Sequence, residues 1–291
     1  MPPDKFAATW VSHSSMRDFL SCPRAYYLNN VYRDPNTKHK IQLMSPALAL
    51  GGAVHEVVES LSVLPAPDRL KESLISKFDK VWKKVTGEKG GFSNDSQEQQ
   101  YKQRGEAMLR RIMNNPGPIT RLAVKIKEEL PQFWLSESDN IILCGKIDWL
   151  EYLPDSDSVH IIDFKTSKRE EAGESLQLPI YHLLVSRTQR HKVSGASYWY
   201  LELSDELQEK ELPDLHAAEE QVLQIAKKIK LARQLGKFAC PEGENGCRTC
   251  RPLEKIVRGQ AKQIGVNSYN QDVYILTGAD DAPLEEQSVI L

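Results

Sequence analysis

Two apolar runs separated by a short turn constrain the fold of this chain more than any other feature of its sequence. The runs are residues 141–153 and 159–166, and both are rich in Ile, Leu, Val, Trp and Tyr. Residues 154–158 between them, PDSDS, have the composition of a turn. The pattern predicts a β-hairpin, and a four-residue loop between Leu153 and Ser158 fixes its register.

This register places two acidic side chains face to face. Asp148 lies directly opposite Asp163, and Lys165 shares their face of the sheet. Opposed acids destabilise a strand pair unless a cation neutralises them, and Mg²⁺ binds one or two carboxylates together with water and phosphate oxygens. Lys165 then suits the stabilisation of negative charge on a phosphate. An isolated D-x-K motif, however, more often lies on a solvated sheet face with the lysine as an ion-pair partner.

Two helical segments carry further candidate site residues. Gln177 and Tyr181 are four positions apart, on one face of a helix predicted after the hairpin. Far upstream, residues 47–64 form an apolar helical pattern with His55 on its first turn. A lone histidine on such a helix is usually a core residue or an exposed one. Glu56 and Glu59 stand near His55, but the pattern does not separate them from solvated helix residues.

Taken in order, these motifs resemble those of RecB-family nucleases in the PD-(D/E)xK superfamily. The motifs are Gly51-x-x-x-His55, Gly145-x-x-Asp148, Asp163-Phe164-Lys165 and Gln177-x-x-x-Tyr181, and the resemblance spans roughly residues 12–255. In one departure from the family pattern, Asp148 follows Gly145-Lys146-Ile147 and not a proline.

The resemblance implies a role for each motif residue. His55, Asp148 and Asp163 would bind Mg²⁺ or Mn²⁺, and Lys165 would be catalytic. Gln177 and Tyr181 would brace the site and the DNA. Either Glu128 or Glu129 is a candidate for an additional acid at the metal site, and the sequence does not choose between them.

The cysteines predict a second metal centre. Cys240, Cys247 and Cys250 form a C-x6-C-x2-C group in a Gly- and Pro-rich loop, and Cys22 is the candidate fourth ligand. Cys144 lies in an apolar run and is interpreted as a core thiol. Four cysteines suit either a [4Fe–4S] cluster or structural Zn²⁺. The arrangement resembles the iron–sulfur RecB-like nucleases, including CRISPR adaptation exonucleases and AddB-type proteins, which favours the cluster. Those proteins commonly carry C-x2-C before the longer gap, whereas here the longer gap comes first.

Composition limits the partners of the chain. Its 291 residues are 40% hydrophobic and 27% charged, with a formal net charge of −2. A DNA-binding protein of this charge must concentrate positive charge in a groove. No apolar run reaches the ~18 residues of a membrane span, and the N-terminus lacks the layout of a signal peptide. We therefore expect a cytoplasmic protein with reduced thiols and no membrane association.

The resemblance also implies the organisation of the chain. We expect an α/β restriction-endonuclease-like core, a central mixed sheet flanked by helices, in a nuclease domain of residues 1–260. It would contain a helical insertion at 65–125 and a cysteine loop at 238–255 packed near the N-terminal helix. That first helix is expected from about Ser12, with a weak capping box between Ser15 and Asp18. Residues 261–291 are polar and acidic and are interpreted as a tail.

The expected function is metal-dependent hydrolysis of DNA, with an exonuclease favoured over an endonuclease, in DNA processing, repair or recombination. No Gly-x-x-x-x-Gly-Lys-Ser/Thr motif is present, so unwinding would depend on a helicase or other repair or CRISPR protein. The alternative is a catalytically silent nucleic-acid-binding or scaffold subunit of a helicase–nuclease or CRISPR adaptation complex. The intact His55, Asp148, Asp163 and Lys165 argue against that alternative.

Overall fold

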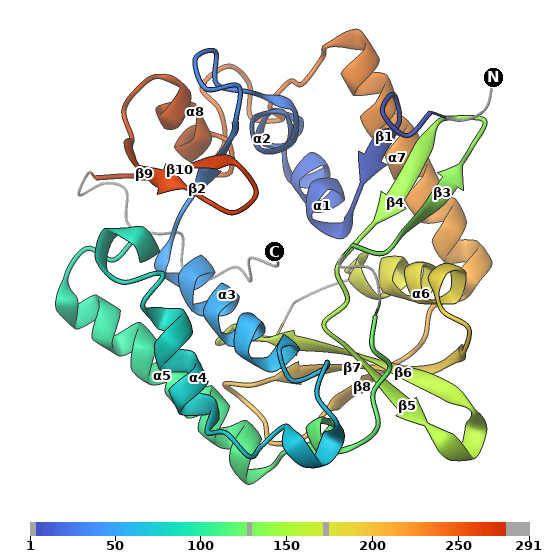
Figure 1. The fold of residues 1–291 in the computed structure, drawn as a ribbon. Coiled ribbons are helices and arrows are strands. Elements are labelled where there is room, and N and C mark those ends of the chain that lie inside the picture. Colours follow the sequence, from blue (N-terminus) through green and yellow to red (C-terminus); the bar gives the residue numbers. More distant parts are fainter. Residues whose placement is uncertain (1–3, 127–129, 171–174, 278–291) are drawn as a thin grey trace.

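The computed structural model describes residues 4–126, 130–170 and 175–277 as a mixed α/β protein (Figure 1). Within these ranges the strands form three sheets, with helices packed against them. In chain order the helices and strands are β1 Thr9–Val11, α1 His13–Ser21, α2 Pro23–Tyr26, η1 Tyr27–Val31, β2 Lys40–Leu43, α3 Pro46–Glu59, η2 Ala66–Asp68, α4 Leu74–Trp82, η3 Gly87–Gly90, α5 Asp95–Asn114, η4 Gly117–Thr120, β3 Gln132–Ser136, β4 Ile141–Cys144, β5 Trp149–Leu153, η5 Pro154–Ser156, β6 Ser158–Lys165, α6 Gln177–Thr188, β7 Lys192–Tyr200, β8 Gln208–Lys210, α7 Leu215–Leu235, α8 Arg251–Val257, β9 Lys262–Val266 and β10 Gln271–Ile275.

The sheet β5-β6-β7-β8 lies between two layers of helices. Strand β6 pairs with β5 in antiparallel and with β7 in parallel orientation, so the sheet is mixed. Ile161 on one face packs in a core with α6 and α7, whereas Ile162 and Phe164 on the other pack in a core with α3, α4 and α5. The predicted fold class, mixed sheet flanked by helices, is therefore confirmed. Because both faces are covered, β6 is buried along almost its whole length, including Asp163 and Lys165.

The hairpin forms in the predicted register, but its first strand is shorter than expected. Leu153 pairs with Ser158 and Trp149 with Ile162. The expectation of one strand over residues 141–153 is wrong, because β4 pairs instead with β1 and β3 in a separate sheet. The chain changes sheets at Gly145, where an added Cβ would lie 2.8 Å from the Cδ1 atom of Leu184 in α6. Glycine therefore lets the chain pass close to α6 on its way to Asp148.

Helix α1 begins directly after Ser12, the residue that caps it. The Ser12 side chain accepts the Ser15 N–H, and the Ser15 side chain accepts the Ser12 N–H. The capping box expected between Ser15 and Asp18 is therefore wrong by three residues, because Ser12 has the extended backbone that a cap requires. Asp18 instead accepts hydrogen bonds from the side-chain amides of Asn29 and Asn30.

The region 65–125, interpreted as a helical insertion, contains α4 and α5 with three short 3₁₀ helices near them. Both helices pack with α3 against the central sheet in one hydrophobic cluster that includes Trp149 and Trp199. At Gly105 of α5, an added Cβ would lie 2.4 Å from the ring of Phe78 in α4. Glycine at this position therefore lets α5 pack closely against α4.

The predicted C-terminal tail is wrong for residues 262–275. These residues form β9 and β10, and β10 pairs in parallel with β2 from the start of the chain. The buried Asp272 carboxylate accepts a hydrogen bond from Thr37 and lies 3.0 Å from Nδ1 of His39. Residues 278–291 lie outside the described ranges.

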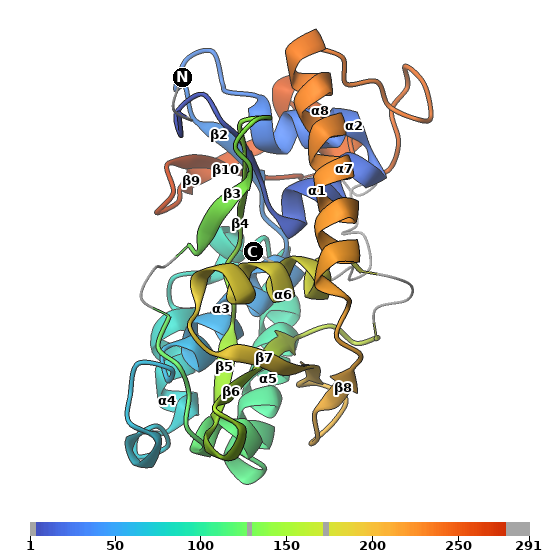
Figure 2. The same ribbon diagram turned by 90° about the vertical axis from the view of Figure 1, so that its right-hand side faces the viewer.

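Helix α7 packs against elements from the N-terminal and the central parts of the chain. Figure 2 shows this long helix alongside α1 and α6, and its neighbours also include the sheet β1-β4-β3. In the part of the chain that the structure describes, no helix combines the length and apolar character needed to cross a membrane.

Candidate active site and cysteine centre

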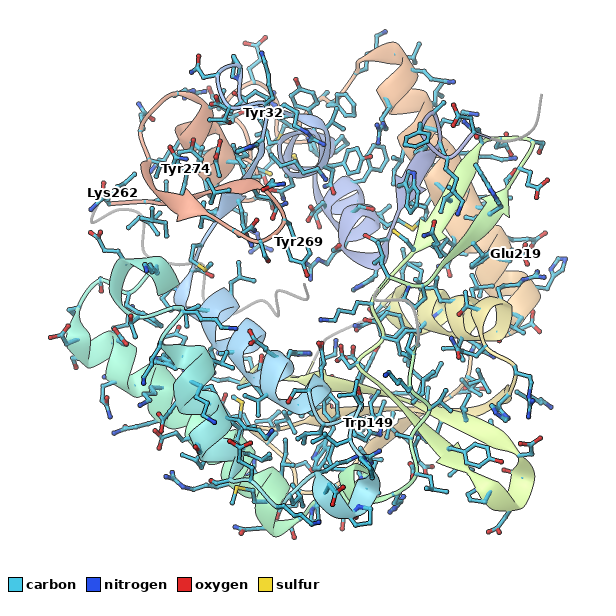
Figure 3. The ribbon with its side chains drawn as sticks, in the orientation of Figure 1. Tyr32, Trp149, Glu219, Lys262, Tyr269 and Tyr274 are labelled. Atoms are coloured by element: carbon cyan, nitrogen blue, oxygen red, sulfur yellow. The ribbon has the colours of Figure 1, made fainter. Side chains whose placement is uncertain are left out.

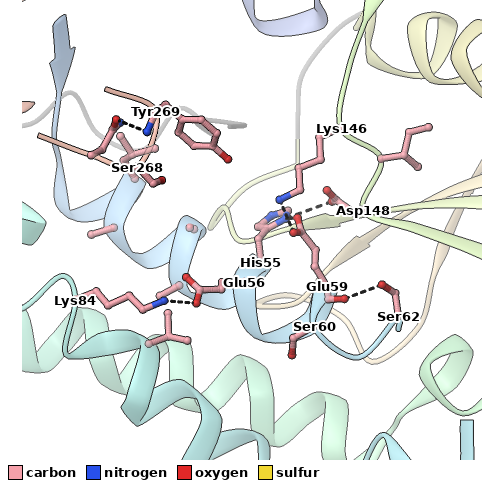
Figure 4. Close-up of a pocket in the computed structure, with 18 of the residues that line it drawn as sticks. His55, Glu56, Glu59, Ser60, Ser62, Lys84, Lys146, Asp148, Ser268 and Tyr269 are labelled. Carbon is pink, nitrogen blue, oxygen red and sulfur yellow. Dashed lines mark hydrogen bonds and ion pairs between the residues drawn. The ribbon is translucent and has the colours of Figure 1, made fainter. Parts of the chain in front are cut away.

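A pocket of about 610 Å³ lies between α3, the segment 146–150 that leads into β5, and the β9–β10 turn (Figure 4). Gly51 and Gly52 of α3 are part of its lining. Having no side chains, they leave space beside the candidate metal ligands.

Three side chains in this pocket bring ligand atoms together. One ligand atom each from His55, Glu59 and Asp148 lies within 4.8 Å of the others. His55 Nδ1 is 3.4 Å from Asp148 Oδ2 and 3.7 Å from Glu59 Oε1. Imidazole and carboxylate groups together suit Mn²⁺, and the carboxylate oxygens suit Mg²⁺. The residues present therefore fit a divalent cation.

The helix explains why Glu59 belongs to this group and Glu56 does not. Glu59 is four residues after His55, which places both on one face of α3. Glu56 points elsewhere and pairs with Lys84 at 2.5 Å. This spacing was a signal in the sequence for choosing Glu59. The candidate acids Glu128 and Glu129 lie outside the described residues.

The charges of the group are balanced within the protein. Burial lowers the pKa of His55, but the charge of Asp148 and hydrogen bonds to Asp148 and Glu59 outweigh it and raise the pKa to about 10. Burial opposes ionisation of Asp148, yet His55, the Phe164 N–H and Lys165 hold its pKa below the ordinary value. Lys146, which sequence reasoning missed, pairs with Glu59 at 2.5 Å.

A second set of predicted residues forms a buried network next to Asp148. Lys165 Nζ lies 3.1 Å from Asp163 Oδ2 and donates to Gln177 Oε1 at 2.5 Å. The Gln177 amide donates to Asp163 Oδ1 at 2.7 Å and to the Tyr181 hydroxyl at 3.2 Å. The structure therefore brings together Asp163, Lys165, Gln177 and Tyr181, all of which are buried.

The hairpin register connects this network to the pocket. The Phe164 N–H, between Asp163 and Lys165, donates to Asp148 Oδ2 at 3.0 Å. Burial raises the pKa of Asp163 to about 7, and the charge of Asp148 adds to the rise while Lys165 opposes it. Asp163 lies outside the compact group of His55, Glu59 and Asp148. Its oxygens contact Gln177 and Lys165 instead.

Two residues near Lys165 escaped the sequence reasoning. The Lys165 ammonium lies 4.7 Å from the ring centroid of Tyr198 in β7, which pairs in register with Asp163. His13 at the start of α1 is buried, and burial, followed by the charges of Arg17 and Lys165, lowers its pKa to about 3. Neither residue stands in a motif, because both approach the site through packing of distant elements.

The four predicted cysteines converge at a second site. The sulfur atoms of Cys22, Cys240, Cys247 and Cys250 lie within 4.8 Å of one another, and all four residues are buried. Cys250 Sγ is 3.7 Å from Cys247 Sγ and 3.8 Å from Cys240 Sγ. The cysteine loop therefore packs near the N-terminal helices, as predicted. Cys144 is buried elsewhere, 3.5 Å from the Val11 carbonyl oxygen.

The donor set and spacing fit a metal centre. Burial opposes ionisation of Cys247, but the N–H groups of Cys250 and Thr249 and neighbouring thiols lower its pKa to about 6. Tetrahedral Zn²⁺, with Zn–S bonds of ~2.3 Å, holds thiolates about 3.8 Å apart. Thiolates that bind separate irons of a cluster lie further apart. The spacing therefore matches a single ion more closely than a cluster.

The basic side chains of α4 and α5, and Lys84 just after α4, are engaged with acids. Carboxylates lie within salt-bridge distance of Lys77, Lys80, Lys84, Arg110 and Arg111. Arg24 likewise pairs with Glu254 and donates to carbonyl groups of the cysteine loop. Several of these pairs are exposed and contribute little stability.

Comparison with known proteins gives one family. A sequence model of the PD-(D/E)XK nuclease superfamily matches residues 10–252, a range that includes every candidate ligand and ends before β9. A solved structure described as a "putative exonuclease" from Eubacterium rectale aligns with a TM-score of 0.48 and 14% identity, over 89% of this chain and 91% of that chain. No curated protein matches the sequence.

Proposed function

Since the chain belongs to the PD-(D/E)XK nuclease superfamily, we propose that it is a metal-dependent DNA nuclease of RecB type and acts as an exonuclease. Membership of the superfamily implies a nucleic-acid substrate and phosphodiester hydrolysis. The observation that carries the proposal is the contact between the ligand group and the buried network that contains Asp163 and Lys165. Asp148 belongs to the ligand group and also accepts the N–H that separates Asp163 from Lys165.

In this proposal His55, Glu59 and Asp148 hold the cation, with Asp163 next to them. A divalent metal there would supply Lewis acidity and an activated water. Lys165 supplies a fixed positive charge beside Asp148, where it can stabilise negative charge on the scissile phosphate. Gln177 holds both Lys165 and Asp163 through its amide, and Tyr181 positions Gln177. A charge held this firmly needs no rearrangement during reaction.

A nuclease assay tests the function. Purified protein is incubated with end-labelled single-stranded DNA, duplex DNA and RNA, with Mg²⁺, Mn²⁺ or EDTA. We expect metal-dependent loss of DNA, with mononucleotides or short products released progressively from one end. A closed circular single strand distinguishes an exonuclease from an endonuclease, because an exonuclease leaves the circle intact. Absence of cleavage on every substrate and metal would contradict the proposal.

The cysteines form a separate part of the proposal. We infer that Cys22, Cys240, Cys247 and Cys250 hold a structural metal centre. The resemblance to iron–sulfur nucleases supports a [4Fe–4S] cluster, whereas the sulfur spacing supports Zn²⁺. Anaerobic purification followed by iron, sulfide and zinc analysis distinguishes them. Roughly four irons and four sulfides per chain indicate the cluster, and one zinc indicates the single ion.

A further inference from the structure

The β9–β10 turn forms a wall of the pocket although it lies beyond the family match. Asn267, Ser268 and Tyr269 line the pocket together with His55 and Asp148, whereas the match ends at residue 252. The turn is therefore a feature that the superfamily motifs do not explain. It brings residues from near the C-terminus to the candidate active site.

Tyr269 is exposed where an aromatic residue contributes nothing to the core. Its relative exposure is 71%. Figure 3 shows its side chain projecting from the β9–β10 hairpin, and in Figure 4 its ring points across the pocket toward Lys146 and His55. A large apolar face left in water at a pocket is available to a ligand.

The turn that carries Tyr269 is fixed by hydrogen bonds. The Asn267 side-chain oxygen accepts the N–H of Tyr269 at 2.9 Å and that of Gln271 at 3.0 Å. The Asn267 amide donates to Gln42 of β2 at 2.7 Å. Asn270 completes the turn in the left-handed region at φ 55°. Because the backbone of the turn is already ordered, binding of a ligand at Tyr269 costs little backbone conformational entropy.

The ammonium group of Lys146 lies in the same pocket as the aromatic face of Tyr269, and it pairs with Glu59 at 2.5 Å. An exposed lysine in an ion pair is charged at neutral pH, and the Lys146 side chain is 41% exposed. The mouth of the pocket thus offers an aromatic face and an ammonium group beside the metal-ligand group. This combination suits a single-stranded nucleic acid, because bases stack on aromatic rings and phosphates pair with cationic side chains.

We propose that Tyr269 stacks on an unpaired base of a nucleic-acid strand whose backbone enters the pocket, with Lys146 contacting a phosphate of the same strand. The inference rests on the proposed function and deepens it by naming the substrate class. In a duplex both faces of an internal base are covered by its neighbours. Stacking on Tyr269 therefore selects single strands and frayed ends.

Binding measurements test this inference without requiring catalysis. Fluorescence anisotropy compares wild type, Tyr269→Ala and Tyr269→Phe on a labelled oligothymidine strand, with Ca²⁺ in place of Mg²⁺. We expect Tyr269→Ala to weaken binding by about 5-fold or more, the usual effect of removing one stacking ring. Tyr269→Phe, which retains the ring, should bind as wild type does. Phe6→Ala is the matched control, since Phe6 is fully exposed and outside the pocket lining.

Two further substrates separate stacking from other contacts. On a strand of the same length with abasic sites, wild type and Tyr269→Ala should bind equally, and on a blunt duplex the loss should be smaller. Unchanged binding of oligothymidine by Tyr269→Ala, or an equal loss on the abasic strand, would overturn the stacking assignment. If wild type still cleaves DNA, only this inference fails. If wild type neither binds nor cleaves, the proposed function fails with it.

Discussion

The two candidate metal sites differ in how the protein balances their charge. At the active site every acid has a cationic partner: His55 for Asp148, Lys146 for Glu59 and Lys165 for Asp163. At the cysteine centre four buried thiols face one another, and the hydrogen bonds that lower the pKa of Cys247 come from N–H groups and neighbouring thiols. The acids of the first site are neutralised within the protein, whereas the four thiols of the second would be held together by the proposed metal.

The surroundings of the two sites differ in the same way. The active site lies on α3, β5, β6 and α6, which the two larger hydrophobic clusters hold in place. The third cluster has nine buried residues in the described chain, and four of them are the cysteines. A core this small stabilises little by itself. We therefore expect the first site to use its proposed metal for chemistry and the cysteine centre to use its proposed metal for folding.

The largest expected effect concerns activity at the first site. Lys165→Met should lower the rate of DNA cleavage by about 10²-fold or more, because it removes the fixed charge beside Asp148. The fold should persist, since Asp163 can become neutral by binding a proton. Initial rates on end-labelled DNA, together with thermal unfolding, measure both. The control is Lys228→Met on the exposed face of α7, which should keep full activity. Metal-dependent cleavage by Lys165→Met at the wild-type rate would contradict the assignment.

The second prediction tests the folding role of the cysteine centre. Cys22→Ala should reduce bound metal and lower the apparent unfolding temperature by about 10 °C or more, because metal binding contributes directly to folding free energy. Cys144→Ala removes an equally buried thiol outside the centre and should lower it by only a few degrees. Metal analysis and calorimetry measure the two effects. A full metal complement in Cys22→Ala would show that Cys22 is a packing thiol.

The third prediction concerns protons released when a metal enters the first site. A histidine ligand must be neutral, so His55, with its pKa of about 10, must lose a proton. Asp163, with a pKa of about 7, is mostly charged at pH 8 and mostly protonated at pH 6. The number of protons released on metal binding should rise from about one at pH 8 toward about two at pH 6. The affinity for Mn²⁺ should decrease as the pH is lowered, because protons compete with the metal. Titration calorimetry in buffers of different ionisation enthalpy counts these protons. Binding without proton release would exclude His55 as a ligand.

The smallest expected effect is on stability at Asp148. If the opposed acids Asp148 and Asp163 simply repelled each other, Asp148→Asn would stabilise the metal-free protein or leave it unchanged. The structure reverses this expectation, because Asp148 pairs with His55 and accepts the Phe164 N–H. Asp148→Asn should therefore lower the free energy of unfolding by about 1–2 kcal/mol. Urea unfolding in EDTA measures the change, and Glu56→Gln, outside the ligand group, is the control. Stabilisation by Asp148→Asn would restore the repulsion interpretation.

The sequence by itself determined the local geometry of the active site. The turn between Leu153 and Ser158 and the apolar runs beside it fixed the register of β5 and β6. That register predicted the relation of Asp148 to Asp163 and Lys165, because side-chain direction alternates strictly along a strand. The spacing of Gln177 and Tyr181 likewise placed both on one helix face. The cysteine spacing predicted the four-thiol cluster.

Tertiary structure alone decided which distant elements meet. An apolar run does not show which strand it pairs with, so residues 141–144 were assigned to the hairpin when they belong with β1 and β3. Residues 262–275 were interpreted as part of a polar tail, yet β10 pairs with β2 near the start of the chain. That pairing brings Tyr269 to the pocket. Contacts between residues so far apart depend on the packing of the whole chain, which leaves no periodic signal in either segment.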